Sequence, residues 1–180
     1  MESLCLEFVN SEFREFRGRW VRDDLRQPEW LARFLEKWHL SIEQHADEAL
    51  LTELIELRTL LTRIISVLPT LAGVDAQDLA TLNTLLARTP FHYQAECIEM
   101  KLQMSSQPVQ RNWDWVQSEI IVDFLALLTE HDSRRLKICQ NPHCRGAFYD
   151  ETKSRTRRYC SIEKCANLMK VRRFRARKKG

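Results

Sequence analysis

Two pairs of cysteines near the carboxyl end constrain the fold of this chain more than any other feature of its sequence. Four residues separate the cysteines within each pair and fifteen separate the pairs, in the order Cys139, Cys144, Cys160 and Cys165. Two closely spaced thiol pairs joined by a short loop can converge on one tetrahedral metal ion. Four thiolates leave no open coordination position, so such a metal is structural, and zinc suits a sulfur-only site best. The spacing therefore predicts one structural Zn²⁺ held by all four cysteines.

A pair of disulfides is the alternative interpretation of the same cysteines. The chain begins Met1-Glu2-Ser3, without the basic segment or small-residue cleavage site of a secretory signal, so we expect a cytoplasmic protein, in which disulfides are rare. Residues 136–180 also carry few apolar side chains, and a module of this size rarely folds on hydrophobic burial alone. Zinc can supply on the order of 10 kcal/mol of folding free energy to such a module. These arguments favour metal binding over disulfides.

Three further residues are candidates for metal or thiol chemistry. His143 lies beside Cys144 and could compete as a ligand, but four thiolates already complete the coordination shell, so we expect His143 to be exposed at the tip of a turn. Cys5 and Cys97 lie among apolar residues. Because buried cysteine behaves as a small hydrophobic residue, we expect both to pack in the core.

The charge of the chain is divided unevenly between its two parts. Residues 134–180 carry 16 Lys and Arg against 3 Asp and Glu, a balance of +13, whereas residues 1–133 carry the other 12 against 22, a balance of −10. This division predicts two domains, an acidic body over 1–133 and a basic contact module over 134–180. Opposite charges could merely help the two parts to dock, but their concentration on one short segment favours a nucleic acid as the partner.

The segment around the cysteines predicts a knuckle, a hairpin and a helix. Asn141-Pro142 is a turn signal within the first cysteine pair. We expect a short β-hairpin over 148–159, and a helix from Glu163 onward that places Cys165 in its first turn. Together these elements predict a zinc finger similar to a treble clef.

The final helix is predicted to be basic on several faces. Leu168, Val171 and Phe174 recur every three residues and are expected to dock the helix on the hairpin. A basic helix on a rigid zinc site can lie against phosphates or enter a major groove, and the energy from counterion release grows with the number of charges. We therefore expect double-stranded DNA to contact ten residues of the module: Arg155, Arg157, Arg158, Lys170, Arg172, Arg173, Arg175, Arg177, Lys178 and Lys179.

The rest of the chain predicts a helical body. Four glycines and five prolines make up about 5% of the 180 residues against a usual value of about 12%, which argues against a turn-rich all-β fold. No apolar run reaches the roughly 18 residues of a membrane-spanning helix, so no membrane is expected as a partner. Apolar alternation predicts a strand pair between Phe91 and Met104. Apolar spacing and caps predict helices over 28–38, 50–68 (ended by Pro69), 75–88 (capped by Asp75, with Leu79, Leu82 and Leu86 inward) and 113–131 (capped by Asn112). The expected fold class is mainly α with a small β-hairpin, a helical body followed by a zinc finger that ends in a basic helix.

Nothing in the body predicts catalysis. The sequence has no glycine-rich phosphate loop, no HExxH motif, no nucleophile elbow and no C-x-x-C redox pair, so we do not expect an enzyme. Asn10, which closes the apolar run from Leu4 to Val9, is the one candidate ligand-binding residue. The alternative for Asn10 is a local cap or turn, a role that asparagine often has.

Both ends of the chain resemble known families. Four stretches are similar to the CGNR-type zinc finger of bacterial proteins, and they read Cys139-Gln-Asn-Pro-His-Cys144, Phe148-Tyr149-Asp150, Arg157-Arg158-Tyr159-Cys160-Ser161 and Cys165-Ala166-Asn167. The opening is similar to the start of the ABATE domain that such proteins carry, and it reads Leu4-Cys5-Leu6-Glu7-Phe8-Val9-Asn10-Ser11. The resemblance implies the same four zinc ligands and a stress-response regulator of transcription. The chain departs from the family at Ala166 and Leu168, which replace glycine and arginine, and at Tyr159, which replaces the usual tryptophan.

These observations predict a bacterial transcription regulator. Its zinc module is expected to bind DNA while the acidic body senses a ligand or mediates dimerisation, and since one small module buries too little surface for tight binding, we expect a homodimer. One alternative is an RNA-binding or ribosome-associated protein, in which Tyr149 and Tyr159 stack on unpaired bases. The other is a zinc-stabilised interaction module whose basic helix covers an acidic partner or the acidic body of the same chain.

Overall fold

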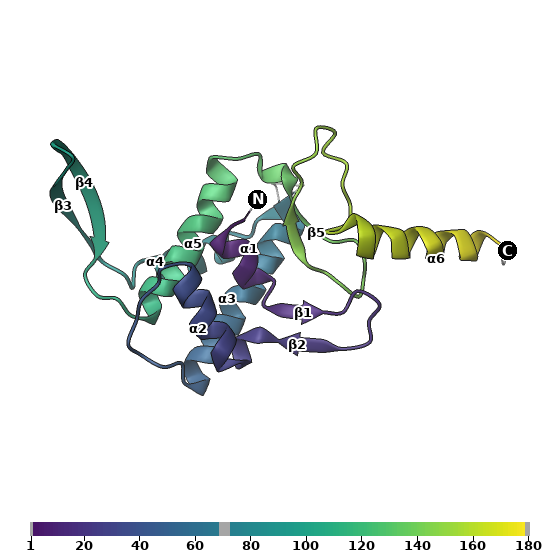
Figure 1. The fold of residues 1–180 in the computed structure, drawn as a ribbon, viewed down its shortest axis with the longest axis horizontal. Coiled ribbons are helices and arrows are strands. Elements are labelled where there is room, and N and C mark those ends of the chain that lie inside the picture. Colours follow the sequence, from purple (N-terminus) through teal and green to yellow (C-terminus); the bar gives the residue numbers. More distant parts are fainter. Residues whose placement is uncertain (1, 69–72, 179–180) are drawn as a thin grey trace.

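The chain folds into six α-helices and three pairs of antiparallel strands (Figure 1), which the computed structural model describes over residues 2–68 and 73–178. The helices are α1 (Leu4–Val9), α2 (Pro28–Lys37), α3 (Glu48–Val67), α4 (Ala76–Leu86), α5 (Trp113–Thr129) and α6 (Asn167–Arg177). The strand pairs are β1 (Glu12–Arg14) with β2 (Val21–Asp23), β3 (Phe91–Ile98) with β4 (Lys101–Pro108), and β5 (Leu136–Ile138) with β6 (Ala147–Tyr149). Single turns of helix connect some of them, namely η1 (Asp24–Arg26), η3 (Ser133–Arg135) and η4 (Ile162–Ala166). The predicted fold class, mainly α with small β, is confirmed.

Polar caps set where three of the helices begin. The side chain of Asp47 accepts a hydrogen bond from the Leu50 amide at the start of α3, and Asp75 does the same for α4. Asn112 accepts from the Trp115 amide at the start of α5, as predicted. Each cap satisfies an amide that has no partner within its helix. The predicted end of α3 at Pro69 lies outside the described residues.

Helices α1, α3 and α5 enclose the main core. Val116, Ile120, Phe124 and Leu127 of α5 are buried as predicted, and Cys5 of α1 is fully buried among them. Helix α4 departs from the prediction, because Leu79 is 47% exposed. The inward face of α4 is centred on Leu82 and on Asp78, which forms an ion pair with Arg63 of α3.

Strands β3 and β4 form a long two-stranded ribbon that projects away from the helices (Figure 1). The predicted strand pair is confirmed and is longer than expected, with register running from Phe91 opposite Pro108 to Ile98 opposite Lys101. Cys97 is exposed on this ribbon, so the expectation that it packs in the core was wrong. The body does not cover the part of the ribbon that carries Cys97.

The strand pair of the zinc module differs from the predicted hairpin. Strand β6 pairs with β5, which precedes the first cysteine, and not with the segment that leads to Tyr159. The pairing follows from the turn over 139–146, which reverses the chain and brings 136–138 beside 147–149. Leu136 and Ala147 of this pair lie within the main core of the body. The division of the chain at 133/134 stays a prediction, since the two parts share these core residues.

Within residues 2–68 and 73–178, no helix combines the length and the apolar character that crossing a bilayer demands.

Candidate zinc centre and nucleic-acid interface

A tight turn between β5 and β6 presents the first two cysteines. The amide of Cys139 donates to the carbonyl oxygen of Gly146 at 2.8 Å, and the amide of Cys144 donates to that of Asn141 at 3.0 Å. Arg145 then takes a left-handed conformation with φ of 52°, which turns the chain back into β6. This knuckle brings both thiols to one side of the turn.

The third and fourth cysteines lie at the end of a loop and in the turn η4. The Gln140 amide donates to the Arg158 carbonyl oxygen at 2.9 Å, which holds the loop beside the knuckle just before Cys160. The side chain of Ser161 caps η4 by accepting from the Lys164 amide. Cys165 therefore lies in the first helical turn of the segment, as predicted, and it is buried.

The four sulfur atoms have the spacing that a zinc ion requires. The ligand atoms of Cys139, Cys144, Cys160 and Cys165 all lie within 4.8 Å of one another. The Sγ atom of Cys160 lies 3.5 Å from that of Cys144 and 3.8 Å from that of Cys165. A tetrahedron with Zn–S bonds of about 2.3 Å has sulfur–sulfur edges of about 3.8 Å. The predicted donor set thus fits one tetrahedral Zn²⁺.

The four thiols lie close enough together to shift one another's pKa. Hydrogen bonds from the Cys144 and Cys160 thiols hold the pKa of Cys139 well below that of an ordinary thiol. The hydrogen bond that Cys160 donates to Cys139 raises the pKa of Cys160 in turn. Four sulfurs this close cannot all be thiolates without a compensating positive charge, and a divalent ion supplies it.

Asn141 joins the zinc site to the body. Its buried side chain donates through Nδ2 to the carbonyl oxygen of Phe16 at 2.7 Å and to the Sγ atom of Cys165 at 3.3 Å. The neighbouring His143 is exposed at the tip of the turn, as expected, and its ring lies over Gly18. Gly18 has a φ of +84°, and a Cβ at this position would lie 2.4 Å from the His143 ring. From the sequence, Asn141 was expected only to form a turn, and no local pattern indicates its contact with the β1–β2 loop.

Asn10 makes a second link between the two parts. Its Oδ1 accepts from the Ala147 amide at 2.8 Å, and its Nδ2 donates to the Ala147 carbonyl oxygen at 3.0 Å. The side chain thus pairs with β6 as a neighbouring strand would. Ligand binding by Asn10 stays a prediction, and the contact that the structure shows joins α1 to β6.

Asp150 organises the loop that leads to Cys160, and the sequence reasoning missed it. Its carboxylate is fully buried and accepts from the amides of Thr152 and Arg157 and, at 2.7 Å, from Nζ of Lys137. Burial raises the pKa of Asp150, but the hydrogen bonds from Lys137 and Thr152 outweigh it and hold the pKa well below its usual value. An aspartate two residues before a threonine is typical of a local side-chain turn, which was the available signal.

The three loop arginines of the predicted DNA-binding set have different surroundings. Arg155 forms an ion pair with Asp132 at 2.8 Å. Arg157 donates to the carbonyl oxygens of Tyr159 and Cys160, and its guanidinium lies 5.1 Å from the centre of the Phe148 ring. Arg158 is exposed, and within the described residues its side chain has no hydrogen bond or ion pair. Of the three, Arg158 is the one whose side chain has no polar partner among the described residues.

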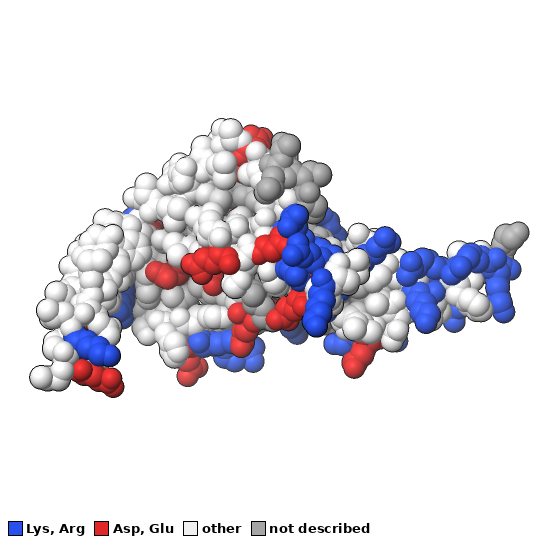
Figure 2. Space-filling model, turned by 90° about the horizontal axis from the view of Figure 1, so that it is seen from above, with Lys and Arg blue, Asp and Glu red and all other residues white. Residues whose placement is uncertain are grey.

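Helix α6 carries most of the remaining basic residues into solvent. No side chain of α6 is buried, and over residues 2–68 and 73–178 no carboxylate forms an ion pair with a side chain of this helix. Figure 2 shows blue Lys and Arg side chains along this projecting helix. The basic residues of the helix and its cap that the structure describes are Lys170, Arg172, Arg173, Arg175, Arg177 and Lys178. Lys179, the last of the predicted set, lies outside the described residues.

The expected docking of α6 on the hairpin was wrong. Val171 is 45% exposed and Phe174 is 55% exposed, and Leu168 is only half-buried. The hairpin that was to receive them over 148–159 does not form, because that segment is the loop held by Asp150. Helix α6 is therefore held at its start, next to Cys165, and extends away from the module (Figure 1).

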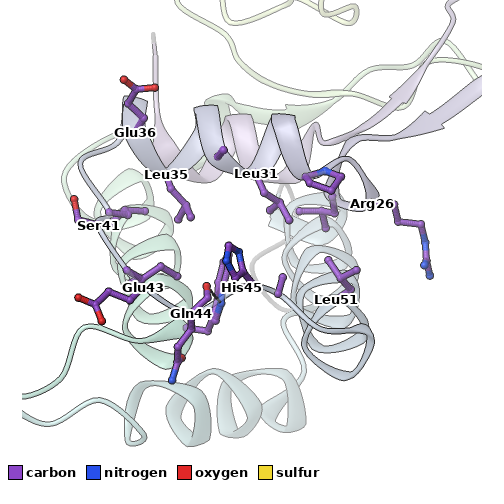
Figure 3. A pocket seen from close by; sticks show the side chains of 16 residues that line it. Arg26, Leu31, Leu35, Glu36, Ser41, Glu43, Gln44, His45 and Leu51 are labelled. Carbon is purple, nitrogen blue, oxygen red and sulfur yellow. Dashed lines mark hydrogen bonds between the residues drawn. The ribbon is translucent and has the colours of Figure 1, made fainter.

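The body contains a cavity of about 530 Å³ between α2, the start of α3 and the extended segment 40–46. Its walls are mainly apolar and include Leu31, Leu35, Leu51 and Trp113. Figure 3 shows Leu31, Leu35 and His45 pointing into the opening and Glu36 pointing away from it. The volume and the lining are typical of sites for small molecules.

Comparisons with known proteins confirm the resemblance at both ends of the chain. The family model for the CGNR zinc finger matches residues 135–178. The model for ABATE, described as "Putative stress-induced transcription regulator", matches residues 2–131. No curated protein matches the sequence. Since the second match spans well over half of the chain and the first contains the four clustered thiols, the chain belongs to the ABATE family and carries a CGNR zinc finger that holds one structural zinc ion.

Proposed function

We propose that this ABATE-family regulator binds double-stranded DNA through α6 and Arg158, and that it does so as a homodimer. The observation that carries the proposal is the environment of α6, a helix without buried side chains whose cationic groups have no acidic partner among the described residues. The zinc site fixes the start of this helix through Cys165. Binding is therefore zinc-dependent, because the direction of α6 depends on the folded module.

The distribution of charge around α6 favours a groove over a flat acidic surface. At about 100° per residue, Lys170, Arg173 and Arg177 lie on one side of the helix, and Arg172 and Arg175 lie on the other. A major groove about 12 Å wide has phosphates along both edges, so a helix inside it contacts anions on two sides. A protein surface offers anions on one side only. The two-sided pattern thus supports DNA over an acidic protein partner.

Tyr149 and Tyr159, which would stack on bases in the RNA-binding alternative, make contacts within the protein. Tyr149 is half-buried and makes an edge contact with the ring of His131 at 5.9 Å. Tyr159 is half-buried against the cluster of Cys139, Phe148 and Cys165. Stacking on an unpaired base needs an open ring face, so neither residue supports the RNA alternative.

The body has two roles in the proposed regulator. It brings two copies together, because one module of this size covers too little DNA for tight specific binding. Its cavity beside α2 is the place where a small apolar effector fits, with Leu31 and Leu35 on its wall.

Selection of duplexes from a random DNA pool tests the function directly. Zinc-loaded protein is expected to enrich a two-fold symmetric motif, and the chelated protein is expected to enrich none. A motif that is enriched equally with and without zinc would contradict the role of the zinc module. The absence of any motif, with salt-sensitive binding to RNA instead, would support the RNA alternative.

A salt titration with matched variants tests the role of α6. Neutralising about six phosphates gives a slope near −5 for log affinity against log salt. Arg172→Ala combined with Arg173→Ala should reduce the magnitude of the slope by about 2 with zinc still bound. The control is Arg26→Ala combined with Arg33→Ala, which removes the same charge from the body and should leave the slope unchanged. An equal slope in parent and α6 variant would place the DNA contact elsewhere.

A further inference from the structure

The ribbon formed by β3 and β4 has one face without any charge. Residues directly opposite in an antiparallel pair point to the same side. The register therefore places four pairs on one face, namely Phe91 with Pro108, Tyr93 with Ser106, Ala95 with Met104, and Cys97 with Leu102. Of the residues that the structure describes on this uncharged face, none is acidic or basic.

The opposite face of the ribbon is polar. It carries the pairs His92 with Gln107, Gln94 with Ser105, Glu96 with Gln103, and Ile98 with Lys101. Hydrogen bonds within this polar face join Gln94 to His92 and Ser105 to Glu96. The polar face is thus suited to water, which leaves the uncharged face as the one that needs a partner.

The uncharged face lies in solvent. Tyr93 is 73% exposed, Met104 is 74% exposed and Leu102 is 85% exposed. The ribbon projects from the body in Figure 1, and in Figure 2 it is white except at one end. A two-stranded ribbon is marginally stable by itself in water, and exposed apolar patches of this kind mark interaction sites.

We propose that the uncharged face packs on the same face of a second copy of this chain, so that the two ribbons form the centre of the homodimer. This inference rests on the proposed function, which requires two copies. Two copies of a face without charge do not repel each other. The commonest homo-oligomers are two-fold symmetric dimers, in which the same surface patch of each copy contacts its counterpart. Nucleic acid is disfavoured here, because Lys101 is the only cation of the ribbon against Glu96 and Glu99.

The available area is sufficient for a dimer. Aromatic and aliphatic side chains of this number offer on the order of 600 Å² per copy when they are covered. Two stacked faces then bury about 1,200 Å², the lower end of the range for specific interfaces. The composition also fits, since Tyr, Phe and Met are enriched in interface cores. The ribbon and α6 lie at opposite ends of the molecule (Figure 1), so such a dimer leaves α6 open to DNA.

Two neighbouring substitutions on opposite faces test the interface. Met104→Glu places a charge on the uncharged face, and Gln103→Glu places the same charge on the polar face of the same strand. The zinc-loaded parent and Gln103→Glu are expected to be dimers at micromolar concentration in light scattering. Met104→Glu is expected to weaken dimerisation at least roughly hundredfold, because a buried unpaired charge is costly. Unchanged zinc content and circular dichroism show that each variant is folded.

Cys97 gives a second measurement on the unmodified interface. Cys5 is buried and the other four cysteines are held by zinc, so Cys97 is the thiol that an alkylating reagent reaches. Its alkylation should slow about tenfold as the protein concentration rises through the dimerisation range, since reactivity depends on exposure. In Met104→Glu the rate should stay fast at every concentration.

The outcomes separate this inference from the proposed function. A monomeric parent, a dimer that Met104→Glu leaves intact, or a Cys97 rate independent of concentration would overturn the ribbon interface. A ribbon-dependent dimer that enriches no DNA motif would support the interface and contradict the DNA-binding proposal.

Discussion

The helical body and the zinc module are stabilised by different interactions, although Leu136 and Ala147 of the module lie in the core of the body. The body buries a continuous set of apolar side chains from α1, α3 and α5. Apart from Leu136 and Ala147, which belong to the core of the body, the described part of the module buries a small cluster of Cys139, Phe148 and Cys165, with half-buried neighbours around it. Apolar burial can hold the body, whereas the module depends on its metal and on the hydrogen bonds of Asp150. The body is therefore expected to tolerate loss of zinc and the module is not.

Removing a zinc ligand is the strongest test of this difference. Cys165→Ser should release zinc and unfold the module, at a cost on the order of 10 kcal/mol of coupled folding energy, while α3 and α5 keep their structure. Zinc stoichiometry and hydrogen exchange of the α5 amides measure the two effects. The exposed Cys97→Ser is the control and should bind zinc like the parent. Full zinc content in Cys165→Ser would refute the ligand assignment, and loss of protection in α5 would show that the body depends on the metal.

A substitution that creates a cavity in α5 tests whether apolar packing stabilises the body. Phe124 of α5 is fully buried, and Phe124→Ala should lower the free energy of unfolding by about 3–5 kcal/mol. Val122, two residues earlier on the same helix, is 48% exposed, so Val122→Ala should cost well under 1 kcal/mol. Urea unfolding followed by tryptophan fluorescence measures both values. Similar costs for the two variants would mean that apolar packing in α5 does not stabilise the body.

The two kinds of stabilisation also explain what the sequence could reveal. Periodic apolar residues predicted α2 to α5 within a few positions, and Asp75 and Asn112 were recognised as caps because capping is local. The zinc ligands could be predicted because four cysteines at fixed spacing are a local pattern too. These features need no knowledge of which elements meet in space.

The failures concern contacts between segments far apart in the sequence. The predicted hairpin over 148–159 was wrong because nothing in residues 136–138 indicates that they form a strand. The knuckle over 139–146 reverses the chain, and only this turn brings β5 beside β6. Val171, Phe174 and Cys97 were expected to be covered because they are apolar, but apolarity does not say whether a partner surface lies within the same chain. Asn10 and Asn141 contact segments more than a hundred residues away, which a single sequence cannot indicate.

The smallest predicted effect concerns the contact between Asn10 of the body and Ala147 of the module, which tests whether the two parts stabilise each other. Asn10→Ala removes both hydrogen bonds to Ala147 and should cost about 1–2 kcal/mol, since a part-buried amide loses its partner. If the module folds only with zinc, that loss appears as a 5- to 30-fold weaker zinc affinity, although residue 10 lies in the body. Asn112→Ala is the matched control, because it removes the cap of α5 at a cost of about 1 kcal/mol without touching the module. Competition with a chelator of known affinity distinguishes the two variants. Equal zinc affinities for both would mean that the module folds around its metal independently of the body, and that the shared core at Leu136 and Ala147 transmits no stability between them.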